Sequence, residues 1–311
     1  MKRLVAALLA LGAVHCTVPA DEGSAETAAE INVNAIDAAS WMGAVDEQTS
    51  LSALSIPGTH ESCARHEPLP GTAKCQSLGL GDQLEAGVRY LDIRCRHFHD
   101  HFEIHHDLVY QDMTFDDVLG EVIPFLDAHR SETVIMSIKE EYKADRNTRS
   151  FEDTFASYVA KAPARWYLDR AVPSLAAARG KIVLLRRFGA EHTGGLNARP
   201  WGDKATFSVD NDAHLRVQDR YEVKSNDDKW AAIDSLFDEA KTGDEKTLFL
   251  NYTSGYKPQL FGIPNIGKVA DAINPKLDDY FVAAPKGRYG VVAMDFVNRE
   301  RAALVLTKNF R

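Results

Sequence analysis

The chain has 311 residues, of which 45% are hydrophobic and 26% charged, an ordinary globular composition that suffices for one large core or two small ones. Its formal net charge is −9, and because residues 1–20 hold two basic residues and no acidic one, the remainder carries about −11. This acidic balance argues against nucleic-acid binding and against electrostatic attraction to anionic membranes. Any phosphate chemistry must therefore be done by a few basic residues inside a pocket.

Residues 1–20 have the pattern of a secretory signal peptide, with two basic residues, an apolar stretch and the small-residue sequence "VPA". The stretch is too short to span a bilayer, and no later segment is long and apolar enough to do so, which predicts a secreted, soluble protein. Cys16 offers the alternative of a lipoprotein anchor, which His15 just before it disfavours. Residues 21–34 are small and polar and predict a flexible segment.

The rest of the chain, residues 35–311, alternates short apolar runs with amphipathic segments. The predicted strands are Ala53–Ile56, Tyr90–Arg94, Ile104–His106, Thr133–Ile138, Lys181–Arg186, Thr206–Val209, Leu248–Tyr252 and Tyr289–Met294. The predicted helices are a short one around Trp41 and then Leu80–Ala86, Thr114–His129, Phe151–Lys161, Trp230–Ala240 and Val269–Asp279. Strands alternating with helices are typical of parallel βαβ units, so we predict one α/β catalytic domain built as a (β/α) barrel. In such a barrel the residues just past the C-terminal ends of the strands share one face, where the chemistry should concentrate.

The first strand leads into "SIPGTHESC", residues 55–63. Pro57 and Gly58 predict that the strand ends there in a sharp turn, which would place His60 and Glu61 on a loop at its exit. A histidine that only caps the turn is the alternative.

The second strand, "RYLDIRCRH", carries Asp92 and Arg94 on the same face because side chains alternate along a strand. Charges on an inner face are costly to bury unless they are paired or used. Asp92 and Arg94 could form a purely structural ion pair. Alternatively, the Asp92 carboxylate holds the Arg94 guanidinium in place to bind an anion such as phosphate.

The next segment, "HFHDHFEIHHDLVY", is rich in histidine. His97, His99 and His101 alternate, so a strand would bring them together as metal ligands, but the charged residues among them favour an exposed turn over residues 97–102. His105 and His106 follow at a strand end and are better placed for a site.

Further charged residues stand at the ends of later apolar runs. They are Lys139 and Glu141, Arg186 and Arg187, and Asp295. Solvated charges would be scattered over helices as well, so their gathering at strand ends predicts a shared site.

Three cysteines follow the predicted signal peptide. Export favours a disulfide, and Cys63 and Cys75 bracket the loop "CARHEPLPGTAKC", which makes them the predicted pair. Cys95 is expected to be buried in a strand, and nothing nearby marks it as an activated thiol.

These residue types suit phosphodiester cleavage without a metal or other cofactor. Two imidazoles can act as base and acid on opposite sides of phosphorus, and a carboxylate can fix the tautomer of each. An arginine can neutralise the charge that grows on the non-bridging oxygens.

The sequence resembles bacterial phosphatidylinositol-specific phospholipase C. The resemblance rests on seven ordered segments between about Trp41 and Ala303, which are "SIPGTHES", "GVRYLDIRCR", "HHDLVY", "SETVIMSIKEEY", "ARGKIVLLRRF", "VQDRY" and "VVAMDF". It implies a single irregular TIM-like barrel that cleaves phosphatidylinositol, and as a further candidate substrate glycosyl-phosphatidylinositol anchors, to diacylglycerol and inositol 1,2-cyclic phosphate. The partner would be a membrane surface contacted transiently by a monomer.

The same resemblance assigns roles to residues. His60 would be the general base oriented by Asp295, His106 the general acid assisted by Glu61, and Arg94 the phosphate ligand. The other residues that it implicates are Asp92 beside the arginine and, around the inositol ring, Lys139, Glu141, Arg187, Asp219 and Tyr221. Because calcium-using relatives carry an acidic residue in place of Arg94, no metal requirement is expected.

The chain departs from the family pattern at Glu61, where aspartate is usual, so the carboxylate reaches one methylene further. The loop "TSGYKPQLFGIPNIGK" offers Tyr256, Leu260, Phe261 and Ile263 for weak contact with lipid, with Leu69 as a further candidate, although loop packing is the alternative. Two other functions stay open. They are a metal-dependent phosphodiesterase of glycerophosphodiesters and a catalytically inactive barrel that binds lipid or glycan.

Overall fold

The structure is a computed structural model that describes residues 36–310. The predicted signal peptide, the predicted flexible segment and Cys16 lie outside this part, so their interpretation, and that of export, stays a prediction. Within residues 36–310 no helix is long and apolar enough to cross a membrane.

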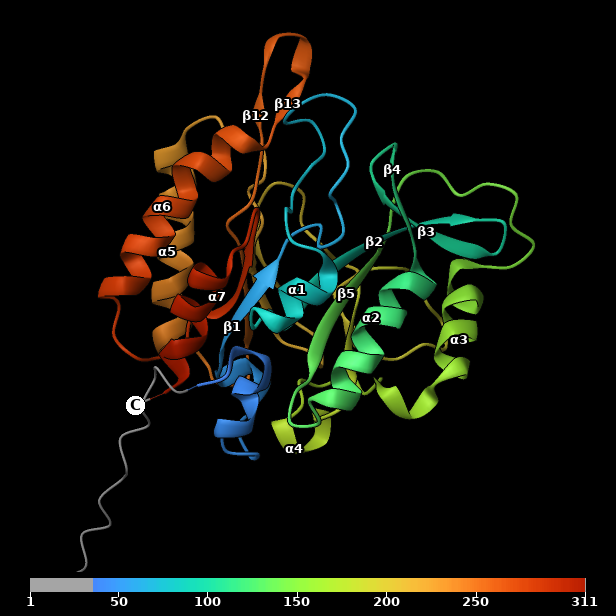
Figure 1. Cartoon of the computed structure of the whole chain (residues 1–311), viewed down its shortest axis with the longest axis horizontal. Coiled ribbons are helices and arrows are strands. Elements are labelled where there is room, and N and C mark those ends of the chain that lie inside the picture. Colours follow the sequence, from blue (N-terminus) through green and yellow to red (C-terminus); the bar gives the residue numbers. More distant parts are fainter. Residues whose placement is uncertain (1–35, 311) are drawn as a thin grey trace, which may run out of the picture. The chain divides into compact units, whose positions relative to one another are not determined.

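The centre of the fold is a curved, largely parallel sheet (Figure 1). Its main parallel strands are β1 (Ser55–Thr59), β2 (Tyr90–Phe98), β5 (Val134–Glu140), β7 (Ile182–Arg186), β10 (Leu215–Gln218), β11 (Leu248–Tyr252) and β14 (Gly290–Met294). The shorter strands β6 (Trp166–Tyr167), β8 (Leu196–Asn197) and β9 (Thr206–Val209) complete its edges. The order is β6-β7-β5-β2-β1-β14-β11-β10-β9, so in the described part of the chain the two end strands do not pair and the barrel is not closed by hydrogen bonds. The predicted irregular TIM-like barrel is confirmed.

Two additions extend this barrel. Strands β3 (His101–His106) and β4 (Val109–Thr114) continue β2 as an antiparallel meander, and β12 (Lys257–Pro258) and β13 (Pro264–Asn265) form a separate hairpin that projects beyond the sheet in Figure 1. The 3₁₀ turn η5 (Leu260–Gly262) forms the tip of that hairpin. The sequence predicted only the second half of β3, Ile104–His106, and did not predict β4.

Helices cover the outer face of the sheet. They are α1 (Leu80–Glu85), α2 (Phe115–Ala128), α3 (Phe151–Lys161), α4 (Leu175–Ala178), α5 (Asn226–Thr242), α6 (Gly267–Ala283) and α7 (Arg299–Leu306). The 3₁₀ segments besides η5 are η2 (Ala38–Ala44), η3 (Leu51–Ala53), η4 (Pro163–Arg165) and η6 (Thr307–Asn309). Capping boxes formed by Thr114 with Asp117 and by Ser150 with Asp153 fix the starts of α2 and α3.

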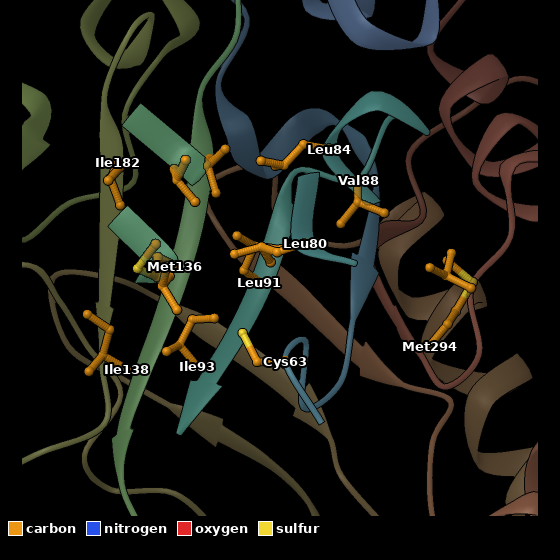
Figure 2. Packing of buried hydrophobic residues seen from close by; sticks show 14 of the residues in the cluster. Cys63, Leu80, Leu84, Val88, Leu91, Ile93, Met136, Ile138, Ile182 and Met294 are labelled. Carbon is orange, nitrogen blue, oxygen red and sulfur yellow. The ribbon is translucent and has the colours of Figure 1, made fainter. Parts of the chain in front are cut away.

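Successive side chains along each strand point alternately into two hydrophobic clusters, one on each face of the sheet. On β2, Leu91, Ile93 and Cys95 belong to the cluster shared with the helices, part of which Figure 2 shows, whereas Tyr90 belongs to a second cluster inside the barrel. Trp41 of η2 is fully buried in the inner cluster, in agreement with the predicted short helix around it. Alternation therefore decides which residues of each strand point into the barrel.

Pro57 and Gly58 do not end the first strand, so that prediction is wrong. Both lie inside β1, which pairs along its whole length with β14, while pairing with β2 begins only at Gly58. A side chain at Gly58 would come within 2.9 Å of the Cβ atom of Tyr90, so glycine allows the two strands to approach. The polar loop follows directly after Thr59.

The predicted exposed turn over residues 97–102 is also wrong in its extent. Strand β2 runs to Phe98 and β3 begins at His101, so only His99 and Asp100 form the turn, both in the left-handed region. His97 is buried, packs edge-on against two phenylalanine rings and shares a hydrogen bond between its Nε2 and the hydroxyl of Thr154 at 2.8 Å. The alternating histidines therefore do not form a group of metal ligands.

Candidate active site

The predicted site residues continue the inward-facing positions of the strands. On β2, Asp92 and Arg94 follow Tyr90 at intervals of two, and His60 and Asp295 stand in the same relation to inward-facing Ile56 of β1 and Ala293 of β14. Because parallel strands end at the same edge, this periodicity brings distant segments of the chain together above the inner core.

An open cavity of about 800 Å³ lies at this end of the barrel. The predicted residues that line it are His60, Arg94, His106, Lys139, Glu141, Arg187, Asp219 and Tyr221. Glu61, Asp92 and Asp295 are buried beside it. The structure therefore gathers all eleven predicted catalytic and substrate-binding residues around one cavity.

His60 is held by two opposite partners. Its Nδ1 lies 2.8 Å from Oδ1 of buried Asp295, and its Nε2 lies 2.9 Å from Nη2 of Arg94. A guanidinium can only donate, so Nε2 carries a lone pair and Nδ1 carries the proton that it donates to Asp295. This is the tautomer that a general base needs.

Arg94 is surrounded by acidic side chains. Its guanidinium lies 2.6 Å from Oε1 of Glu61, 3.2 Å from Oδ2 of Asp92 and 3.8 Å from Oε2 of Glu141. Burial opposes the charge of Arg94, but its acidic neighbours outweigh burial and raise its pKa. The arginine is therefore a fixed positive charge at the cavity wall.

Asp92 organises the floor of the site. Its carboxylate accepts hydrogen bonds from Arg94, from Nη1 of Arg187 at 3.3 Å and from the hydroxyl of Ser137 at 3.2 Å. Burial opposes its ionisation, but Arg94 and Arg187 outweigh burial and hold the pKa of Asp92 well below its usual range. It stays ionised and fixes both guanidinium groups.

Glu61 and His106 form the second acid–base element. Burial raises the pKa of Glu61 to about 8, although neighbouring Arg94 opposes this rise, and its Oε1 lies 3.8 Å from Nε2 of His106. The Nδ1 of His106 donates to the carbonyl oxygen of Ala73 at 2.6 Å, so its Nε2 faces the carboxyl group. Burial and then Arg94 lower the pKa of His106. A buried carboxyl group that keeps its proton is thus placed beside an imidazole that lacks one.

Another wall of the cavity combines charged and aromatic groups. Lys139 Nζ lies 2.6 Å from Oε2 of Glu141, and the guanidinium of Arg187 lies 3.7 Å above the ring of Trp201. The indole N–H of Trp201 donates to Asp219 at 2.9 Å. Such a wall can hydrogen-bond several hydroxyls of a polyol.

Sequence reasoning missed two residues of this wall, Trp201 and Asp203. Both line the cavity, and the hydroxyl of Tyr221 donates to Asp203. They lie in the loop between β8 and β9, where no strand periodicity points to them. The only signal was the sequence "PWGD", an aromatic residue next to glycine and an acid.

The predicted disulfide is not formed, because Cys63 and Cys75 are separate buried thiols. Cys63 packs in the cluster shared with the helices, near Leu80 and Ile93 (Figure 2), whereas Cys75 packs in another small cluster with Ile266. The loop between them folds so that the two sulfur atoms enter different parts of the interior. Cys95 is buried in β2, as predicted.

Comparison with known proteins identifies similar chains. The X domain of phosphatidylinositol-specific phospholipase C matches residues 54–188. The 1-phosphatidylinositol phosphodiesterase of Staphylococcus aureus strain Newman is 31% identical over 280 residues, covering 82% of this chain and 87% of the relative. The enzyme of the same name from Listeria monocytogenes is 29% identical over 288 residues, covering 89% of this chain and 86% of the relative.

Solved structures agree with these sequence matches. A pentafluoro-Phe form of the Staphylococcus aureus phosphatidylinositol-specific phospholipase C superposes with a TM-score of 0.80 at 28% identity, covering 88% of this chain and 98% of that one. The Listeria monocytogenes enzyme superposes with a TM-score of 0.74 at 26% identity, covering 89% and 100%.

Proposed function

Since this chain belongs to the phosphatidylinositol-specific phospholipase C family, we propose that it cleaves phosphatidylinositol to diacylglycerol and inositol 1,2-cyclic phosphate. The observation that carries the mechanism is the arrangement of His60 between Asp295 and Arg94, with His106 on another wall of the same cavity.

In the first step His60 removes the proton from the inositol 2-hydroxyl, and the resulting oxygen attacks phosphorus. Asp295 stabilises the imidazolium that forms. Arg94 leaves Nε2 of His60 when it turns to the phosphate oxygens, which frees the lone pair when substrate binds. The guanidinium then neutralises charge on the non-bridging oxygens.

In the same step the bond from phosphorus to the glycerol oxygen breaks, and that oxygen receives a proton from Nε2 of His106. Glu61 supplies this proton to the imidazole, because its raised pKa keeps it protonated near neutral pH. Water then opens the cyclic phosphate by the reverse sequence, with His106 as base and His60 as acid.

We also propose that exposed apolar residues beside the cavity contact the lipid surface. Leu69 and Leu108 line the mouth of the cavity and are 59% and 65% exposed. Leu260 and Phe261, at the tip of the β12–β13 hairpin, are 77% and 90% exposed (Figure 1). The backbone N–H of Ile266, just after β13, donates to Gly71 O at 2.9 Å and joins the two loops. We propose that this contact is transient and that the secreted protein acts as a monomer.

The test is ³¹P NMR of phosphatidylinositol in mixed micelles with purified protein and EDTA. We expect the resonance of inositol 1,2-cyclic phosphate to appear with the wild type and to vanish with His60→Ala. The exposed His192→Ala variant is the matched control and should retain the signal. No product from the wild type would refute the function, and activity abolished by EDTA would favour the metal-dependent phosphodiesterase.

A further inference from the structure

Cys75 lies beside the proposed general base although the mechanism gives it no role. Its Sγ is fully buried, 3.8 Å from Nδ1 of His106. His60, Cys75 and Asp295 each place one metal-binding atom within 4.8 Å of the other two. Among residues 36–310 this is the one group of three or more His, Cys, Asp or Glu side chains so close together.

Backbone contacts hold these three residues in place. The N–H of Phe296 donates to Cys75 O at 2.7 Å, and the side-chain amide of Gln76 donates to His60 O and to Met294 O, both at 2.8 Å. The segments that carry the thiol, the imidazole and the carboxylate are therefore tied directly to one another. A ligand set with so little freedom loses little entropy on binding an ion.

The donor atoms define the class of ion. A thiolate, an imidazole and a carboxylate suit Zn²⁺ and similar thiophilic divalent ions, whereas Ca²⁺ and Mg²⁺ prefer oxygen ligands alone. Three protein ligands leave a fourth position for water. His60 lines the cavity, so an ion can reach the group from solvent past this side chain.

We propose that His60, Cys75 and Asp295 form an inhibitory site for Zn²⁺. The inhibitory part rests on the proposed function, whereas the binding part does not. On binding, the ion takes the place of the proton that His60 Nδ1 donates to Asp295. That proton is transferred to Nε2, from which Arg94 moves away, and the thiol proton leaves to solvent. A neutral imidazole bound through Nδ1 carries its one proton on Nε2, so the lone pair that removes the 2-hydroxyl proton is no longer available.

Metal binding is tested without any activity measurement. Co²⁺ replaces Zn²⁺ as the probe, because a thiolate ligand gives a near-ultraviolet charge-transfer absorption band. We expect the band in the wild type, its loss on adding Zn²⁺, and its absence from both Cys75→Ser and Cys75→Ala. Cys63→Ser and Cys95→Ser are matched controls, since these buried thiols lie outside the site, and both should retain the band. A wild type without the band, or a Cys75 variant of native thermal stability that keeps it, overturns the proposal.

Inhibition is tested by titrating Zn²⁺ into the phosphatidylinositol assay, with each variant compared with its own metal-free rate. Losing one ligand should raise the Zn²⁺ concentration for half-inhibition by roughly 100-fold or more in Cys75→Ser, and EDTA should restore the wild-type rate. A cobalt band without inhibition by Zn²⁺ refutes the inhibitory role. A wild type that lacks metal-free activity refutes the proposed function instead, while the cobalt titration still decides the site.

Discussion

His60 owes its chemical state to the two groups that contact it. Arg94 can only donate to Nε2 and Asp295 can only accept from Nδ1 while it is ionised, so the two partners select one tautomer together. The carboxylate is thus a positioning group as well as a source of charge.

Replacing Asp295 with asparagine should therefore damage catalysis more than structure. The amide can donate to Nδ1, which moves the ring proton to Nε2, and kcat should fall by about 10³- to 10⁴-fold. Steady-state kinetics measure this fall, while KM and the thermal midpoint should change little. Asp279→Asn, at an exposed position of α6, is the control, and equal kcat values in the two variants would contradict the assigned role.

Much of the site could be predicted from the sequence, because the two-residue period of a strand fixes which side chains point into the barrel. Asp92, Arg94, Lys139 and Asp295 follow inward-facing apolar residues at intervals of two, so an apolar run indicates where they point. Trp201 and Cys75 lie on loops, and spacing along a loop does not fix the direction of a side chain. That is why Trp201 was missed and the Cys63–Cys75 disulfide was wrongly predicted.

Among the elements, β1 is the one whose neighbours determine the position of the base. It lies between β14 and β2, and the N–H of His60 directly after it donates to Met294 O at 3.0 Å. The close approach of β1 to Tyr90 depends on Gly58. A small shift of this strand therefore moves His60 relative to Arg94.

Gly58→Ala should push β1 away from β2, since the new Cβ would lie 2.9 Å from the Cβ atom of Tyr90. We expect the free energy of unfolding to fall by about 1–3 kcal/mol and kcat to fall as well. Gly120→Ala is the control, because nothing lies within 4 Å of its Cβ position inside α2, and it should stabilise by about 0.4–1 kcal/mol. Urea unfolding compares the two, and equal effects would show that the close approach is not needed.

The β12–β13 hairpin allows the proposed lipid contact to be separated from catalysis. Leu260→Ser combined with Phe261→Ser should lower binding to phosphatidylinositol vesicles by about 10-fold or more, because two exposed apolar side chains lose their transfer to lipid. Vesicle sedimentation measures the binding. Turnover of a short-chain, monomeric phosphatidylinositol should stay nearly unchanged.

Val282→Ser is the matched control for the hairpin variant. Val282 is 71% exposed near the end of α6 and does not line the cavity. Unchanged vesicle binding by the double variant, or an equal loss with Val282→Ser, would place the lipid contact elsewhere.

The elements themselves were predictable where an apolar run is long enough to show its period. Thr206–Val209 and Leu248–Tyr252 were predicted with the bounds that the structure has, as was α3. Strand β4 was missed because it is mostly polar and only partly buried. Strand β10 and helix α7 were missed as well. Pro57 misled the prediction because a proline in a strand usually marks an edge or an end.

For the molecule as a whole, Glu61 links folding to pH. Its pKa is about 8 in the folded protein against 4.5 when it is unperturbed, so the folded state keeps a proton that the unfolded state has released. The resulting stabilisation is fully present below pH 4.5 and is lost as the pH rises through about 8.

Glu61→Gln should remove this part of the pH dependence. Between these two pH values the free energy of unfolding of the wild type should decline relative to the variant by up to about 1.4 kcal/mol per pH unit. Urea unfolding at pH 5, 6, 7 and 8 measures the difference. Glu300→Gln, an exposed position on α7, provides the comparison, and identical curves for wild type and Glu61→Gln would show that Glu61 does not hold the proton.

Trp201 has a consequence for how this protein can be observed. All four tryptophans of the chain lie in its described part, and Trp201 is the one that lines the cavity, directly beneath the guanidinium of Arg187. A ligand that draws Arg187 toward itself changes the electric field on this indole while the other three keep their surroundings. Trp201 is thus a natural fluorophore in the cavity wall, and ligand binding can be followed by tryptophan emission in an unlabelled sample.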